Sequence, residues 1–343
     1  MQESRELLKW RLLKTKEVDE ALRTFEDVSV YGGTESSARR GIRILTEEPG
    51  QYNKWLYTLP EPDGTHRLVG LSRRFCPFTN RHYVGGSLYH RGLASEEQLV
   101  PTLTGIAQKV VRRGANRSVP VVFRGLVEQI TPEQIDLLRD WREVQPWTLM
   151  ERKWSLADVI AERKRVRWDD ERGPVWTSDG GHRVELAKLV DAETIYQFQH
   201  CLGQEVNLPD DRFCMRDGIY SVLTYLERHN FFTYFTLGAF LALKSHLRTI
   251  GCLWSYRSFH PARAGWTVWI RRPYVLPQYR RRGLSRALFN AAVGIFAESG
   301  YPTQQKLWVL TGAPSETALQ GARFQVSKDK ARFLAEVTHA EHS

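Results

Sequence analysis

The 343-residue sequence predicts an α/β fold in which a mixed central sheet is flanked by helices. The first observation is local. Trp266–Ile270 is aromatic or β-branched throughout, as expected of a strand, and Pro277 follows it. A basic turn containing Gly283 comes next, and then Leu284, Ala287 and Leu288 recur at helical spacing. The second observation is a faint internal repeat, in which each half of the chain carries strand, turn, helix and strand in the same order.

The N-terminal part of the chain is predicted to begin with a helix and to continue into strands. Residues 1–28 are expected to form an amphipathic helix, since apolar positions alternate with Lys and Glu. Trp55–Leu59 and Arg67–Leu71 are expected to pair as a hairpin across the turn Pro62–Gly64. We assign residues 29–150 to a first α/β domain.

The internal repeat aligns residues 83–126 with residues 274–312. Tyr89–Ala94 is similar to Tyr279–Ser285, and Val121–Gly125 is similar to Trp308–Gly312 as a strand ending in glycine. The right-handed crossover rule makes each copy a βαβ-like unit. The N-terminal copy has one arginine where the C-terminal copy has three, so we expect it to shape the cleft without holding a nucleotide. Chance similarity between two βαβ units is the alternative.

Residues 151–174 are predicted to be a basic helical connector. A helical run over Leu156–Val166 ends in the basic cluster Arg163–Trp168. That cluster has the composition to contact RNA phosphates and to stack on a base, but a solvated linker is the interpretation we favour. Residues 175–343 form the predicted C-terminal domain, in which the segment 333–337 is expected to close the sheet.

The basic turn resembles a known phosphate-binding signature. Arg280-x-x-Gly283-x-Ser285 is similar to (Gln/Arg)-x-x-Gly-x-(Gly/Ala) of the GNAT superfamily of N-acetyltransferases, with Ser285 as the one departure. The resemblance implies a GNAT-type mixed sheet over about residues 175–340. With the repeat, it implies two GNAT-like domains in tandem, the first degenerate because Tyr89 stands where the signature has Gln or Arg. It also implies donor contacts from Val275, Leu276, Arg280, Arg281, Arg282, Gly283, Leu284 and Ser285.

The implied reaction is acyl transfer from a thioester to an amine. The resemblance places the donor for the oxyanion in a splayed strand, at the backbone N–H near Val275 or Leu276. Many GNAT enzymes carry an Asn and, after it, a Tyr that protonates the leaving thiolate. Counting back from Phe324 places Gly312 and Leu319 at these two positions, and leucine has no proton to donate. Either the thiolate leaves unaided or the donor is not a CoA thioester. Candidates for the general base are His200, Glu205, Asp210 and Asp211.

Three functions remain open at this point. The leading hypothesis is an acyl-CoA-dependent N-acyltransferase that uses acetyl-CoA or another acyl-CoA and acts on an amine of a small molecule or peptide. The alternative is an aminoacyl-tRNA-dependent transferase of the FemABX type, favoured by the absent Tyr and by six arginines between Arg271 and Arg286. A non-catalytic binding module is the third.

Composition limits the class of protein. The net charge of +10 favours an anionic partner. Four scattered cysteines predict neither a disulfide scaffold nor a metal site. The longest apolar run, Phe231–Leu243, is shorter than the roughly 20 residues that span a bilayer, and the charged N-terminus lacks a secretory apolar region. We therefore expect a cytoplasmic protein that does not insert into membranes.

Overall fold

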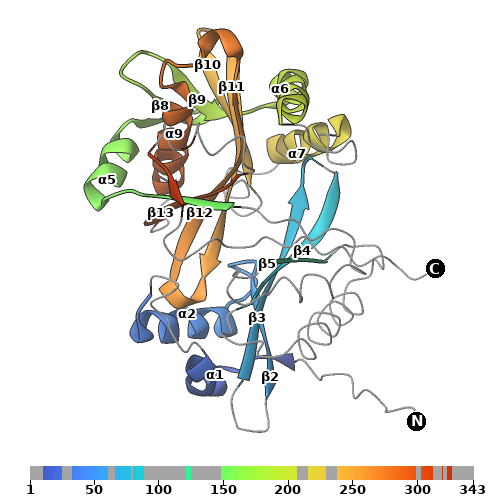
Figure 1. Cartoon of the computed structure of the whole chain (residues 1–343), viewed down its shortest axis with the longest axis vertical. Coiled ribbons are helices and arrows are strands. Elements are labelled where there is room, and N and C mark those ends of the chain that lie inside the picture. The colour runs from blue at the N-terminus through green and yellow to red at the C-terminus, as the bar shows by residue number, and fades with distance from the viewer. Residues whose placement is uncertain are drawn as a thin grey trace, which may run out of the picture.

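The computed structural model describes residues 11–24, 33–60, 66–78, 80–88, 121–124, 148–206, 215–228, 238–298, 303–311, 319 and 323–326. These residues form two β-sheets with helices packed against them (Figure 1). The predicted α/β fold, with a mixed sheet flanked by helices, is confirmed. No helix among these residues is long and apolar enough to cross a membrane.

The smaller sheet has five strands in the order β1-β2-β3-β4-β5. Its strands are β1 (Arg11–Leu12), β2 (Trp55–Pro60), β3 (His66–Cys76), β4 (Arg81–Leu88) and β5 (Val121–Arg124). Neighbouring strands are antiparallel except β4 and β5, which are parallel. The predicted hairpin is confirmed as β2 and β3, in which Trp55 lies opposite Leu71.

Of the predicted helix over residues 1–28, the described residues confirm only the part over Val18–Thr24, and the prediction is wrong for Arg11–Glu17. Arg11 and Leu12 form β1 and pair with Thr58 and Tyr57 of β2. A short 3-10 turn, Thr15–Glu17, follows, and helix α1 covers only Val18–Thr24. The backbone of Lys14 is extended, and Arg11 forms an ion pair with Glu17 at 2.6 Å, which closes the chain into a turn. Pairing with β2 therefore overrides the helical spacing of the leucines.

The larger sheet has nine strands in the order β14-β6-β13-β12-β11-β10-β9-β8-β7. Its strands are β6 (Thr148–Lys153), β7 (Val166–Asp169), β8 (Gly173–Thr177), β9 (Arg183–Leu186), β10 (Ala239–Ser245), β11 (Arg248–His260), β12 (Gly265–Val275), β13 (Thr303–Thr311) and β14 (Gln325–Val326). All neighbours are antiparallel except β12 and β13, which are parallel.

Residues 148–177 belong to the larger sheet rather than only linking two units. Strand β6 pairs with β13 along Thr148–Lys153. Helix α5 (Leu156–Lys164) lies within the predicted helical run, and the β7-β8 hairpin then forms the far edge. Buried Trp154, just after β6, contacts Phe324, with 6.2 Å between ring centroids. The predicted closing strand at 333–337 lies outside the described residues, and β6 occupies the position between β13 and β14.

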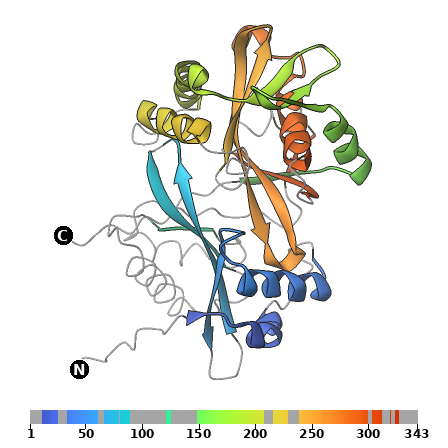
Figure 2. The same cartoon turned by 180° about the vertical axis from the view of Figure 1, so that it is seen from behind.

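The helices cover both faces of the larger sheet. Helices α6 (Ala192–Glu205) and α7 (Arg216–Arg228) lie on one face, and α5 and α9 (Leu284–Glu298) lie on the other (Figures 1 and 2). Short 3-10 turns occur at Leu189–Asp191, Pro261–Arg263 and Pro277–Tyr279. Strand β12 is thus enclosed between helical layers near its C-terminal end.

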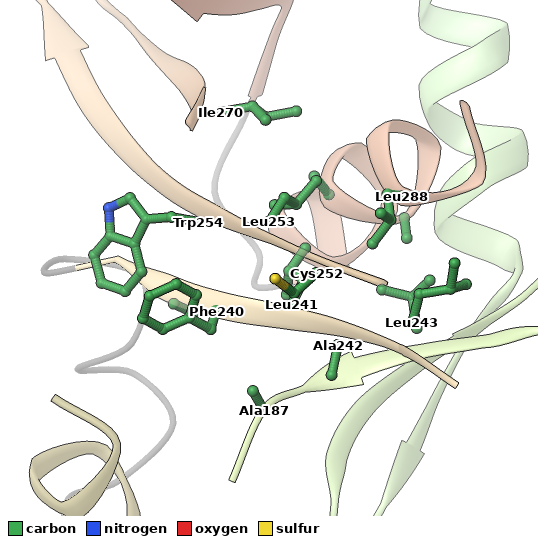
Figure 3. Packing of buried hydrophobic residues seen from close by; sticks show 14 of the residues in the cluster. Ala187, Phe240, Leu241, Ala242, Leu243, Cys252, Leu253, Trp254, Ile270 and Leu288 are labelled. Carbon is green, nitrogen blue, oxygen red and sulfur yellow. The ribbon is translucent and has the colours of Figure 1, made fainter. Parts of the chain in front are cut away.

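The main core lies between β10, β11 and α9. Figure 3 shows Leu253 of β11 on the side of Leu288 from α9, whereas Phe240 and Trp254 pack against each other away from Leu288, with 4.8 Å between their ring centroids. Each of these side chains is at most 3% exposed. This burial holds the central strands and α9 in fixed relative positions, since interiors pack at crystal-like density.

A second core joins the two sheets. The far end of the β11-β12 hairpin reaches helix α2 (Glu35–Glu47), as Figure 1 shows. There Tyr52 stacks on Trp266 with 5.3 Å between ring centroids. The Ser37 hydroxyl donates to the Ala262 carbonyl at 2.7 Å, and the buried Lys54 ammonium donates to the Phe259 carbonyl at 2.8 Å. Strand β12 therefore begins in this second core and ends beside the predicted phosphate turn.

Candidate active site

Strand β12 carries a bulge at Arg272 and Pro273, ahead of the basic turn Arg280–Ser285 that is predicted to hold phosphate. Its pairing with β11 shifts between Cys252, which lies opposite Tyr274, and Trp254, which lies opposite Arg271. Two residues of β12, Arg272 and Pro273, therefore occupy the space opposite one residue of β11. Arg272 has φ 49°, a left-handed conformation that is uncommon for a residue with a Cβ. This arrangement is a β-bulge, which bends a strand and increases its twist.

Beyond the bulge, β12 and β13 separate. Their parallel pairing runs from Trp266 opposite Thr303 to Ile270 opposite Val309 and ends there. Strand β13 continues to Thr311 in register with β6, and β12 continues to Val275 in register with β11. Each strand thus follows a different neighbour, and the ladder between β12 and β13 ends at Ile270; we call the region between residues 271–275 of β12 and the end of β13 the opening. The end of this ladder coincides in position with the splayed strand that the sequence resemblance implies, and that role stays a prediction.

Only one of the two predicted backbone donors faces the opening. The Leu276 N–H donates to the Ile250 carbonyl at 3.0 Å and is already engaged with β11. In an antiparallel pair, hydrogen-bonded and non-hydrogen-bonded positions alternate, so the N–H and C=O of Val275 point away from β11 and toward β13. Val275 therefore stays the predicted oxyanion donor, and Leu276 does not.

The close approach of β11 to this end of β12 depends on Gly251. A Cβ at Gly251 would lie 2.7 Å from the Tyr274 carbonyl oxygen. Real Cβ atoms do not approach a backbone oxygen this closely. A glycine is therefore required for space in β11, directly opposite Val275.

The basic turn has the geometry of an anion cradle. After the 3-10 turn Pro277–Tyr279, both Arg281 (φ 62°) and Gly283 (φ 73°) are left-handed, and α9 begins at Leu284. A Cβ at Gly283 would meet only the Arg286 Nη2 at 3.8 Å, so the surface there is open. The first N–H groups of a helix have no intrahelical partner, and they carry the positive end of the helix dipole. A phosphate group fits these features.

The arginines of the turn divide into two groups. Arg281, Arg282 and Arg286 are exposed around the cradle. Arg280, predicted to contact the donor, turns instead toward α6. Its Nε donates to the Val275 carbonyl at 2.9 Å, and its Nη2 donates to both carboxylate oxygens of Glu205 at 2.7 and 2.9 Å. Arg280 thus ties the turn to the last residue of β12.

The structure describes two of the four predicted general bases, and each of them already has a hydrogen-bond partner. Glu205 is engaged by Arg280, so its oxygens already accept hydrogen bonds. His200 lies 3.2 Å from the Gln204 side-chain nitrogen through Nε2. His200 and Glu205 are five residues apart on α6 and therefore point about 140° apart around the helix. Asp210 and Asp211 lie outside the described residues, so all of these roles stay predictions.

Two further site features follow from the structure. Leu319, where the resemblance predicts an acid, is 1% exposed in the main core, and its carbonyl accepts from the Phe324 N–H at 2.9 Å. Burial raises the pKa of the Tyr274 hydroxyl to about 12, and the nearby Glu205 carboxylate adds to this. At neutral pH Tyr274 is therefore a neutral phenol beside Arg280, with 5.2 Å from the guanidinium carbon to the ring centre.

Helix α5 is joined through Glu162 to α9, the helix that follows the basic turn. One carboxylate oxygen accepts from the Asn290 amide of α9 at 2.8 Å, and the other accepts from the Trp176 indole N–H of β8 at 2.9 Å. A Cβ at Gly294 of α9 would lie 2.6 Å from the Glu162 carbonyl oxygen, so the two helices touch backbone to backbone. Sequence reasoning missed this contact, because Glu162 lies in the segment predicted to be a connector.

Sequence reasoning also missed the bulge in β12 and the α6 residue Gln199, whose side-chain amide donates to the Arg272 carbonyl in that bulge at 3.2 Å. Pro273 was the available signal, since proline cannot donate to a ladder and is confined in sheets to edges and bulges. Gln199 gave no signal beyond its place in α6. Among the described residues, no group of three or more His, Cys, Asp or Glu side chains gathers in a way that could hold a metal.

Comparison with known proteins is consistent with this geometry. Residues 208–318 match the acetyltransferase (GNAT) family. No curated protein gives a significant match. A solved protein from Drosophila is 14% identical, with 97% of this chain and 99% of that chain covered and a TM-score of 0.48. A GCN5-related N-acetyltransferase from Sphaerobacter thermophilus is 15% identical, with 96% and 94% covered and a TM-score of 0.46.

An aminoglycoside acetyltransferase from an uncultured soil metagenomic sample is 16% identical, with 42% and 87% covered and a TM-score of 0.33. At these identities and TM-scores, the solved structures carry no argument about substrate. The family match covers α7, the central strands, the opening and the phosphate turn. The chain therefore carries an acetyltransferase domain of the GNAT family at residues 208–318.

Proposed function

We propose that the protein is an acyl-CoA-dependent N-acyltransferase that modifies an amine of a small molecule or peptide. The observation that carries the proposal is the opening between β12 and β13, which leads directly into the Gly283 turn at the start of α9. A CoA thioester has a pyrophosphate at one end and a reactive carbonyl at the end of a long arm. The turn is suited to the pyrophosphate, and the opening is suited to the arm and its carbonyl.

The chain's own groups have three tasks in this proposal. The N–H groups at the start of α9, with Arg281, Arg282 and Arg286 around them, hold the pyrophosphate. The splayed part of β12 orients the arm. The Val275 N–H donates to the carbonyl oxygen as negative charge develops on it.

When bound, the donor supplies an acyl group on a thioester. The amine nitrogen forms a bond to the carbonyl carbon, the bond from that carbon to sulfur breaks, and the amine passes one proton to a base or to water. Leu319 cannot return a proton to the sulfur, because it is an alkyl side chain buried in the core. We infer that the sulfur leaves as a thiolate, whose ordinary pKa near 8.5 makes this feasible close to neutral pH.

A titration tests the proposal against the aminoacyl-tRNA alternative. Nucleic-acid-free protein is titrated calorimetrically with acetyl-CoA at low and at moderate salt. We expect saturable binding that persists at moderate salt, because the dependence on salt grows with the number of phosphates contacted and acetyl-CoA offers only a few. An absence of binding to acetyl-CoA and to longer acyl-CoAs would overturn the proposal. Binding to aminoacyl-tRNA alone, falling steeply with salt, would support the alternative.

A further inference from the structure

Gln199 is buried against the bulge that opens β12. It lies in α6 and is 1% exposed. Its side-chain Nε2 donates to the Arg272 carbonyl at 3.2 Å and contacts the Cys252 sulfur at 3.3 Å. Because a backbone carbonyl can only accept, the amide nitrogen and not the amide oxygen must face Arg272. One side chain therefore reaches both strands at the position where their register shifts.

The chemistry of Gln199 indicates more than packing. Its Oε1 is buried and has no hydrogen-bond partner in the part of the chain that the structure describes. A buried unpaired carbonyl oxygen destabilises a fold, so an apolar side chain would serve packing alone better. The hydrogen bond that the amide nitrogen donates offsets this destabilisation. That donor reaches a carbonyl in a bulge, where the regular ladder is interrupted.

The bulge determines where the next residues of β12 point. Arg272 has φ 49°, Pro273 has no N–H, and Tyr274 returns to register opposite Cys252. Val275 comes next, and its N–H faces the opening. A change in the direction of the Arg272 peptide unit would therefore rotate the peptide units that follow, Val275 included.

We propose that Gln199 is a positioning residue, which holds the bulge in one geometry and thereby aims the Val275 N–H at the acyl carbonyl of the donor. The inference rests on the proposed function. It predicts that Gln199 affects binding of the donor's arm and not of its phosphates. The Gly283 turn is held separately, by α9 and by the contacts of Arg280.

Two ligands allow binding of the arm to be measured separately from binding of the phosphates. Acetyl-CoA has both the phosphates and the arm, whereas adenosine 3′-phosphate 5′-diphosphate has the phosphates alone. The variant Gln199→Met keeps the length of the side chain and removes the donor. We expect calorimetry to show acetyl-CoA affinity falling about tenfold, as for the loss of one or two hydrogen bonds. Affinity for the nucleotide should stay within about twofold.

Gln197→Met is the matched control. Gln197 lies on the same helix, is exposed, and donates to Glu193 at 3.1 Å. Its substitution should leave both affinities unchanged. If Gln199→Met does not fold, Gln199→Asn replaces it, since the shorter amide cannot span the distance to Arg272. A fall in both affinities together, or in neither, would overturn the inference. If the wild-type protein binds neither ligand, the proposed function itself fails.

Discussion

The two parallel strand pairs among the described residues share a topology but differ in how far the longer strand extends beyond its last pair. In the smaller sheet β4 and β5 pair from Val84–Val121 to Ser87–Arg124, and β4 ends one residue later at Leu88. In the larger sheet β12 continues for five residues beyond its last pair with β13, from Arg271 to Val275. The smaller pair is closed along its described length, whereas the larger pair is open at its end.

The bulge accounts for this difference. Strand β4 pairs with β3 from Arg81 to Leu88 without a register shift, but β12 shifts against β11 at Arg272. Topology alone therefore does not provide a place for a donor arm. We propose that the two sheets are tandem GNAT-like units, of which only the larger can hold a donor. The predictions below test whether this contrast determines function.

The largest effect is expected at the phosphate cradle. Gly283→Asp places a carboxylate where the donor's pyrophosphate is proposed to lie. Two unit charges about 4 Å apart repel by about 4 kcal/mol at an effective dielectric constant near 20. We expect acetyl-CoA affinity, measured by calorimetry, to fall by about a hundredfold or more.

Gly181→Asp is the control for the backbone. Gly181 has φ 74°, nearly that of Gly283, and a Cβ there meets nothing within 4 Å. Both variants therefore carry a similar conformational cost, and only the one at Gly283 should lose binding. Equal affinities for acetyl-CoA in the two variants would contradict the proposal that the Gly283 turn binds the pyrophosphate.

The next effect is expected at Gly251, which lets β11 approach the open end of β12. In Gly251→Ala the new Cβ would overlap the Tyr274 carbonyl oxygen at 2.7 Å. We expect the free energy of unfolding in urea to fall by about 2 kcal/mol, as for other overpacked sites, and acetyl-CoA binding to weaken. Gly180→Ala, whose Cβ would have 3.8 Å of space, should have little effect. A stable Gly251→Ala variant with normal binding would show that the close approach is not needed.

A comparable or smaller effect is expected where α5 holds α9. Glu162→Ala leaves the Asn290 amide and the Trp176 indole N–H without their acceptor. Losing acceptors for buried donors costs about 1–3 kcal/mol, so we expect a loss of about 2 kcal/mol in urea unfolding. The exposed Glu171, changed to Ala, is the control. Unchanged stability in Glu162→Ala would mean that α9 is held by packing alone.

The smallest effect is expected at high pH. The pKa of Tyr274 is raised to about 12 from an ordinary value of 10.0. A raised tyrosine pKa stabilises the fold while the phenol is neutral, so this contribution is complete below pH 10 and is lost as pH rises from 10 to 12. In Tyr274→Phe, the fall in unfolding free energy between pH 9 and pH 11 should be smaller by about 1 kcal/mol. Identical pH profiles would contradict the buried environment of Tyr274.

The sequence allowed prediction of features that depend on local pattern. The strand at Trp266–Ile270, the turn that contains Gly283 and the helix after it are found where the local pattern predicted them. The basic turn was identified because its residues are contiguous. In the same way, the hairpin of β2 and β3 follows from alternation on either side of a turn.

Features that depend on distant contacts could not be predicted. The pairing of Arg11 with Thr58 replaces a helix that the leucine spacing favours. Strand β6 lies beside β13 although about 150 residues separate them in the chain. The direction of Arg280 is set by Glu205, 75 residues away. Gln199 acquires its role only because α6 packs over the bulge.

The most direct test of the contrast between the two sheets is the number of acetyl-CoA molecules bound per chain. Equilibrium dialysis of the wild-type protein against radiolabelled acetyl-CoA measures this number without knowledge of the acceptor. We predict one molecule per chain at saturation, held by the open pair β12 and β13. Two molecules per chain would show that the closed pair also holds a donor, and none would contradict the proposed function.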